Sequence, residues 1–86
     1  MPTAGKPRPG ALSVAIAGIL NQALRDTGAS QRELGATVGI SQSQISKYLR
    51  GERVLDVDQL DAICFALGLN IVTVVSAAEQ AGRSKR

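Results

Sequence analysis

The stretch that decides the fold runs from Ser30 to Gly51 and reads SQRELGATVGISQSQISKYLRG. It contains two short helical patterns with a glycine, Gly39, between them. The first pattern opens with a capping box, because Ser30 and Glu33 are three residues apart and each side chain can accept from the other's backbone amide. The apolar residues Leu34 and Val38 are four positions apart and therefore share one helical face. We therefore predict a helix over Gln31–Val38, ended by Gly39 at positive φ.

The second pattern opens at Ser41, whose hydroxyl suits an N-cap. Behind it, apolar residues recur at the i, i+3, i+4 spacing of one buried helical face. These residues are Ile45, Tyr48 and Leu49. The spacing predicts a helix over Gln42–Arg50, with Gly51 as the glycine that ends it. The apolar Ile40 is expected to fill the corner between the two helices.

The exposed side of the second helix carries amides, hydroxyls and cations, and no carboxylate. Its members are Gln42, Ser43, Gln44, Ser46, Lys47 and Arg50. A helix that is merely solvated usually includes Glu or Asp. Base edges in the major groove of DNA present donors and acceptors, and nearby phosphates repel carboxylates. This face therefore indicates a helix that enters the major groove.

The stretch resembles the helix-turn-helix of the phage Cro/C1 repressor family, also called the XRE family. The matching positions are the first residue of the first helix, its apolar residues and the small residue where the two helices cross, and the turn between the helices. The apolar positions of the second helix and the segment that follows it also match. In this chain these are Gln31, Leu34, Gly35, Val38, Gly39, Ile40, Ile45, Tyr48 and the segment Leu49–Arg53. The resemblance implies an all-α fold, a compact four- to five-helix bundle of the lambda-repressor-like DNA-binding type, whose second and third helices form the helix-turn-helix.

On this resemblance the partner is double-stranded DNA, and the polar residues of the motif fall into two groups. The base-reading group is Gln42, Ser43, Ser46 and Lys47. The phosphate-binding group is Gln31, Arg32, Ser41, Gln44, Arg50 and Arg53. A Gln at a helix N-terminus and the free amides there can bind a phosphate oxygen. Gln42 is the candidate for a bidentate adenine contact, and Lys47 for guanine or phosphate.

Two further helices are predicted from apolar spacing. The first covers about Leu12–Thr27, and its expected buried face is Leu12, Ile16, Ile19, Leu20, Ala23 and Leu24. The other begins after an N-cap at Asp56, with an expected inner face of Val57, Leu60, Ile63, Cys64 and Leu67. Phe65 lies off that stripe and is expected at the helix edge or at an interface.

The apolar stretch from Leu69 to Val75 fits two structures. Its β-branched residues favour a strand, whereas the resemblance implies a last helix capped by Asn70. We predict the helix, over about Ile71–Ala81. Its apolar surface either closes the core or forms a partner surface. Under the second interpretation a homodimer would form through Ile71, Val72, Val74 and Val75.

Composition limits the remaining possibilities. The 86 residues allow one small domain, which we place at residues 11–81 between a flexible basic N-terminal arm (1–10) and a basic tail (82–86). The net charge is +3, with cations in the motif and tails and acids after Val54. There is no histidine, so catalytic, metal and cofactor sites are not expected. One cysteine, no secretory signal and no membrane-spanning apolar run indicate a bacterial cytoplasm.

The sequence favours a sequence-specific DNA-binding transcriptional regulator, a phage or bacterial repressor that acts by occupying its operator. No small-molecule ligand is expected. Two alternatives stay open: an antitoxin or excision factor with the same domain, and a protein-interaction module on the same scaffold. The N-terminal arm is either a solvated tail or a basic arm that follows the DNA backbone or enters a minor groove.

Overall fold

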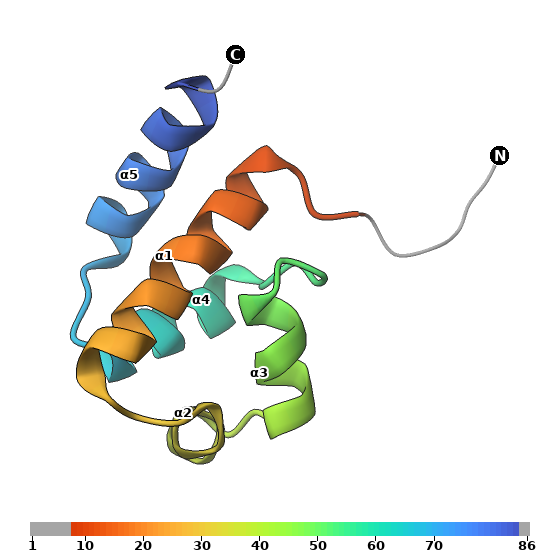
Figure 1. Cartoon of the computed structure of the whole chain (residues 1–86), viewed down its shortest axis with the longest axis vertical. Helices are drawn as coiled ribbons and strands as arrows, with labels where there is room; N and C mark the ends of the chain where they lie inside the picture. Colours follow the sequence, from red (N-terminus) through yellow and green to blue (C-terminus); the bar gives the residue numbers. More distant parts are fainter. Residues whose placement is uncertain (1–7, 85–86) are drawn as a thin grey trace, which may run out of the picture.

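The computed structural model describes residues 8–84, with side chains to Gly82, and all regular structure among them is helical (Figure 1). The helices are α1 (Ala11–Thr27), α2 (Gln31–Val38), α3 (Gln42–Leu49), α4 (Val57–Ala66) and α5 (Ile71–Ser84). The predicted all-α fold is confirmed, and α2 has the predicted bounds. The predicted α3 ended at Arg50, which is instead the residue that caps it.

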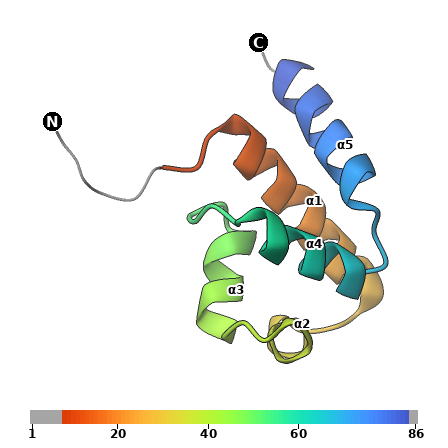
Figure 2. The ribbon, with the colours of Figure 1, turned by 180° about the vertical axis from the view of Figure 1, so that it is seen from behind.

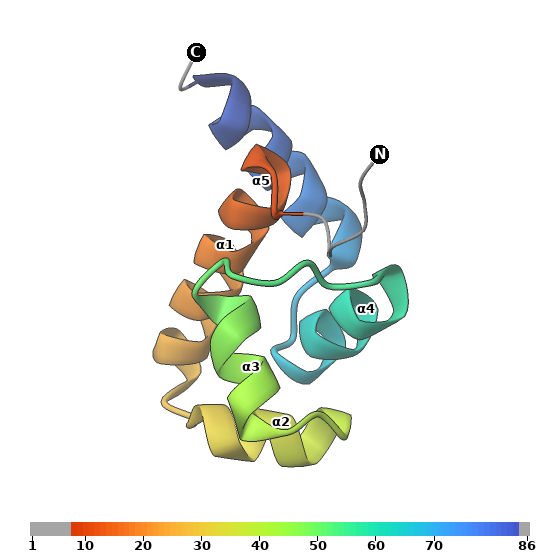
Figure 3. The same ribbon diagram turned by 90° about the vertical axis from the view of Figure 1, so that its right-hand side faces the viewer.

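The helices form a bundle in which α1 and α5 lie side by side (Figure 1). Seen from behind, α4 lies in front of α1 (Figure 2), and it contacts α5. Helix α2 packs against α3 and α4, while α3 also contacts α1. Seen from the side, α3 lies on the outside of the bundle above α2 (Figure 3). One long side of α3 is therefore left uncovered.

Every helix contributes to a single apolar core. Its buried members are Ile16, Leu20, Leu24, Leu34, Ile45, Leu49, Leu60, Ile63, Cys64, Val74 and Ala78. No polar or charged residue is buried among the described side chains. Burial of these side chains supplies the main favourable free energy of folding, and it fixes α3 by its rear face.

The predicted helix caps are confirmed by hydrogen bonds. Ser30 and Asp56 both form complete capping boxes. The Asn70 side-chain oxygen accepts from the Thr73 amide at 3.2 Å. That amide would otherwise lack a partner at the start of α5, so the cap favours helix over strand in this β-branched stretch. Positive φ at Gly39 (74°) ends α2 as expected.

Two predicted core residues are wrong. Leu12 is 45% exposed and Val57 is 74% exposed. Each lies in the first turn of its helix, ahead of Ile16 and Leu60, which are the first buried residues of α1 and α4. Helical spacing places a residue on a face, but it does not say where a neighbouring helix begins to cover that face.

Helix α5 differs from its prediction in length and in its inner face. It continues to Ser84, three residues past the predicted end at Ala81. Val74 is 3% exposed and belongs to the core, so its assignment to a dimer surface is wrong. Ile71 and Val75 are half-buried against the core, which leaves Val72, 69% exposed, as the open apolar residue of the four.

Among the described residues, no single helix is long and apolar enough to cross a membrane. Helix α4 and the part of α5 up to Gly82 reach that length and apolarity only as a pair, which is bent by 108°.

Candidate nucleic-acid interface

The turn between α2 and α3 is closed by backbone contacts to Gly35. The amides of Gly39 and Ile40 both donate to the Gly35 carbonyl oxygen, the second at 2.9 Å. Gly35 is itself buried. A Cβ built on it would lie 2.5 Å from the Ile40 carbonyl oxygen, which is far inside normal contact. The absence of a side chain at Gly35 therefore sets how closely α3 approaches α2.

Helix α3 has a buried rear and an open front. Its rear residues Ile45 and Leu49 are 0% and 3% exposed. Gln42 and Ser43 are exposed, and Ser46 and Lys47 are half-buried. The four base-reading candidates thus lie on the side of α3 that the bundle does not cover, within reach of a ligand.

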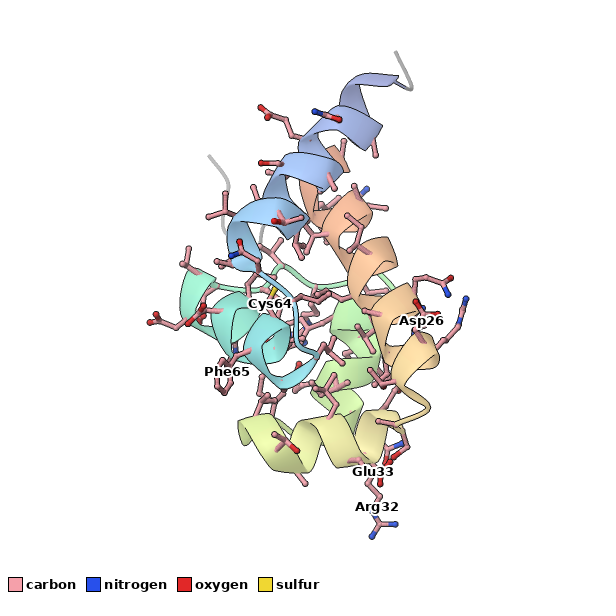
Figure 4. The ribbon with its side chains drawn as sticks, turned by 90° about the vertical axis from the view of Figure 1, so that its left-hand side faces the viewer. Asp26, Arg32, Glu33, Cys64 and Phe65 are labelled. Atoms are coloured by element: carbon pink, nitrogen blue, oxygen red, sulfur yellow. The ribbon has the colours of Figure 1, made fainter. Side chains whose placement is uncertain are left out.

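The N-terminus of α2 presents the first phosphate-binding candidates. Gln31 is half-buried and Arg32 is exposed. Figure 4 shows Arg32 projecting away from the body of the protein at the end of α2. The Glu33 carboxylate is occupied by its bond from the Ser30 amide at 2.8 Å, so the acid next to Arg32 is engaged in the cap.

Ser41 and Gln44 are held together at the start of α3. The Ser41 hydroxyl accepts from the Gln44 amide at 3.2 Å, which confirms the predicted N-cap. The Gln44 side chain is half-buried, and its carbonyl oxygen is buried without a hydrogen bond to any described residue. Gln44 was expected on the flank near the DNA backbone. A phosphate contact would use the amide NH₂ group, because the carbonyl oxygen can only accept.

At the other end of α3, Arg50 is bonded to two neighbours. Its Nη1 donates to the Ser46 hydroxyl at 2.6 Å, and its Nε donates to Glu52 at 2.8 Å. Hydrogen bonding to Arg50 lowers the pKa of Glu52 below its ordinary value. The sequence did not single out Glu52 as part of the site. The sequence feature that could have indicated Glu52 is the run Arg50-Gly51-Glu52. In the structure Gly51 has a φ of 74°, and the chain reverses there.

Arg53 lies beside this cluster. It is half-buried and lines one surface groove with Tyr48, Glu52 and Arg8. Arg8 is exposed and is the first described residue of the predicted arm. Residues 1–7 and 85–86, including Lys6, Lys85 and Arg86, lie outside the described part of the chain. The structure thus brings Arg8 close to the exit of α3.

The described residues hold no group of three His, Cys, Asp or Glu side chains arranged to bind a metal ion. Cys64 is 1% exposed, as expected of a small buried hydrophobe. Burial, and to a lesser degree the charge of Asp61, raises the pKa of its thiol. Figure 4 shows Cys64 turned to the interior, while the neighbouring Phe65 projects from α4. Phe65 is 86% exposed, off the buried stripe as predicted.

Two packed helices, a glycine turn and an outward polar and basic face define a helix-turn-helix unit. A family model described as Helix-turn-helix matches residues 20–74. The chain belongs to this helix-turn-helix family, of the Cro/C1 (XRE) type. It is accordingly a DNA-binding transcriptional regulator.

Solved structures of one bacterial regulator resemble the chain over most of its length. A crystal structure of the clp gene regulator ClgR from Corynebacterium glutamicum aligns with a TM-score of 0.80 and 26% identity, covering 92% of this chain and 83% of that one. A second ClgR structure gives 0.75 and 27%, covering 91% and 96%. No curated protein matches the chain significantly.

Proposed function

We propose that this protein is a sequence-specific repressor that binds double-stranded DNA and acts by occupying its operator. The observation that carries the proposal is the outward face of α3. Ile45 and Leu49 anchor this helix from behind, and Gln42 and Ser43 stand free in front. A helix of this width fits the major groove, where each base pair presents a distinct pattern of donors and acceptors.

Phosphate contacts would set the register of the protein on the duplex. Gln31 and Arg32 stand at the N-terminus of α2, where free backbone amides and the helix dipole favour an anion. Ser41 and the Gln44 amide stand at the start of α3. Arg53 stands beyond its end. Contacts at both ends of α3 would hold it along the groove between two strands of phosphates.

Base contacts would supply the sequence preference. Gln42 is exposed at the first position of α3. Its amide NH₂ can donate to N7 of adenine while its carbonyl oxygen accepts from the N6 amino group of the same base. Such a bidentate pair discriminates by about 1–3 kcal/mol. Ser43, Ser46 and Lys47 follow on the same open side. Lys47 is placed to reach guanine or a neighbouring phosphate.

Repression by occupancy follows from the size of such a complex. A protein seated in the major groove excludes polymerase or another regulator from the same base pairs. ClgR, the similar protein of known structure, is described as a regulator of clp genes, which supports a role in transcription for the same fold. The direction of regulation in this chain, the operator and a phage or bacterial cytoplasmic setting are our proposal.

A homodimer on two half-sites is part of the proposal. Small helix-turn-helix proteins bind half-sites about 34 Å apart, one turn of DNA. Val72 is the exposed large apolar residue among the described side chains of α5, with the half-buried Ile71 and Val75 beside it. Sedimentation of the protein with a full operator tests this. We expect two copies per duplex, and one copy at saturating protein would contradict the dimer.

Selection of bound fragments from the source genome, at a stated physiological salt concentration, tests the function directly. Salt must be fixed because phosphate contacts make affinity fall steeply with ionic strength. We expect enrichment of one motif near promoters, with paired half-sites. Enrichment near a toxin or excision gene would favour an antitoxin or an excision factor. No enrichment over input DNA would contradict DNA recognition and favour a protein-interaction module.

A further inference from the structure

Three side chains at the end of α3 are hydrogen-bonded to one another. The sequence predicts a base contact for Ser46 and a phosphate contact for Arg50, and it assigns no role to Glu52. Arg50 Nη1 donates to Ser46 Oγ at 2.6 Å, Nε to Glu52 Oε2 at 2.8 Å, and Nη2 to Glu52 Oε1 at 3.2 Å. The Arg50–Glu52 pair is therefore bidentate. Two bonds to one carboxylate and a third to a hydroxyl on the preceding turn fix both the position and the plane of the guanidinium.

These bonds do not use up the guanidinium. An Arg side chain has five N–H groups, one on Nε and two on each terminal nitrogen. Each nitrogen of Arg50 makes one of the three bonds, so one N–H on Nη1 and one on Nη2 are left. The side chains of Arg50 and Glu52 are 55% and 54% exposed. A ligand can therefore approach a fork of two donors that is already oriented.

These two N–H groups lie on the same side of α3 as the residues proposed to read bases. Gln42, Ser46 and Arg50 are each four residues apart, so they lie along one side of the helix and its exit. Arg50 is the C-cap of α3, and its backbone keeps an αR conformation. The guanidinium bonded to Ser46 thus continues the line that starts at Gln42.

The charges of Arg50 and Glu52 affect whether the guanidinium binds a phosphate or a base. Hydrogen bonding to Glu52 raises the pKa of Arg50, and hydrogen bonding to Arg50 lowers the pKa of Glu52, so both groups are charged near neutral pH. Their charges cancel at long range, which weakens attraction to phosphate anywhere along the duplex. What is left is a short-range, directional donor pair. Guanine offers the matching acceptors, O6 and N7, in the major groove.

We propose that Glu52 is a positioning residue for DNA recognition: with Ser46, it holds Arg50 so that the two remaining N–H groups read a guanine. The inference rests on the proposed DNA-binding function. It changes two roles within that function. Arg50 becomes a base-reading residue rather than a phosphate contact, and Ser46 supports Arg50 instead of reading a base itself.

The test compares Glu52→Gln with Asp58→Asn in the full chain. Each variant removes one exposed carboxylate and changes the net charge equally, but Asp58 lies in the first turn of α4. Affinity is measured for the sequence selected by the wild type and for a random duplex at the same salt concentration. Both variants should bind the random duplex more tightly. Only Glu52→Gln should lower the ratio of the two affinities, by about tenfold.

Arg50→Ala supplies the second arm of the experiment. In this background Glu52→Gln should act no differently from Asp58→Asn, because the side chain that Glu52 positions is absent. Replacing single guanines of the selected sequence by 7-deazaguanine, which lacks N7, should weaken wild-type binding at one more position than Arg50→Ala binding. Thermal unfolding of each variant shows whether it is folded.

The outcomes separate the inference from the function beneath it. A wild type that binds selected and random duplexes alike would contradict both. A wild type with a clear preference, on which Glu52→Gln and Asp58→Asn act alike, would overturn the inference alone. A phosphate role for Arg50 would also overturn it, and would appear as an equal loss of affinity for both duplexes in Arg50→Ala.

Discussion

Gly35 and Ile40 are joined by a backbone hydrogen bond of 2.9 Å, from the Ile40 amide to the Gly35 carbonyl oxygen. The Ile40 carbonyl oxygen in turn lies 2.5 Å from the position that a Cβ on Gly35 would take, which is closer than normal contact. The turn before α3 therefore rests directly on the backbone of α2. Because α3 carries the residues that we propose to read bases, this contact sets their distance and angle relative to the N-terminus of α2.

The first prediction is that Gly35→Ala destabilises the protein by roughly 1–3 kcal/mol, since overpacking against a backbone atom forces the turn to move. Gly18→Ala is the matched control. Gly18 lies inside α1 with nothing within 4 Å of a built Cβ, so Ala there should stabilise by about 0.5–1 kcal/mol. Urea unfolding gives both values. Equal effects of the two substitutions would contradict the close approach at Gly35.

The second prediction concerns the rotation of α4 about its axis. Phe65 is 86% exposed and Ile63 is 0% exposed. Phe65→Ala should change the free energy of unfolding by no more than about 0.5 kcal/mol, whereas Ile63→Ala should lower it by about 2–5 kcal/mol. Thermal and urea unfolding of the two variants provide the comparison. A large loss from Phe65→Ala would mean that α4 packs on another face.

The third prediction uses the Cys64 thiol. Its pKa in the folded protein is raised by burial and by Asp61, while an unfolded thiol has a pKa of about 8.5. The uncharged thiol is thus favoured by folding. Its contribution is complete below about pH 8.5 and is lost as pH rises through the folded pKa, because the unfolded chain ionises first.

Cys64→Ala removes this titration. Unfolding free energies of the wild type and the variant should differ by a constant amount from pH 6 to about 8. Above about pH 8.5 the wild type should lose stability relative to the variant. Parallel pH curves up to pH 10 would show that the thiol has an ordinary pKa and is not buried as described.

Local chemistry explains which features the sequence could predict. The caps at Ser30, Ser41, Asp56 and Asn70 need only residues within three positions of one another. The turn at Gly39 needs only a positive φ that glycine adopts freely. Side-chain type alone also separates the apolar rear of α3 from its polar front. Local chemistry thus predicted the starts of α2, α3 and α4 and the outward face of α3, whereas the start of α5 at Asn70 was predicted from the family resemblance, because the local β-branched residues favour a strand.

Tertiary contacts explain what the sequence could not predict. Leu12 and Val57 satisfy the spacing of a buried face, but each side chain is left largely exposed in the first turn of its helix. Val74 looks like surface for a partner until α5 is laid along α1, where Val74 and Ala78 enter the core. The role of Glu52 depends on the chain reversal at Gly51. That reversal, and not the type of residue, brings its carboxylate to Arg50.

The most direct test uses the double variant in which Gln42 and Lys47 are both replaced by Ala. Its affinity for the selected sequence is divided by its affinity for a random duplex at the same salt concentration, and this ratio is compared with that of the wild type. Gln80→Ala is the control. It deletes an exposed side-chain amide from α5, outside the proposed DNA-binding face, and should leave the ratio unchanged. Circular dichroism and thermal unfolding should show both variants folded. We predict that the double variant loses at least about tenfold in the ratio. An unchanged ratio in a folded double variant would contradict base reading by α3.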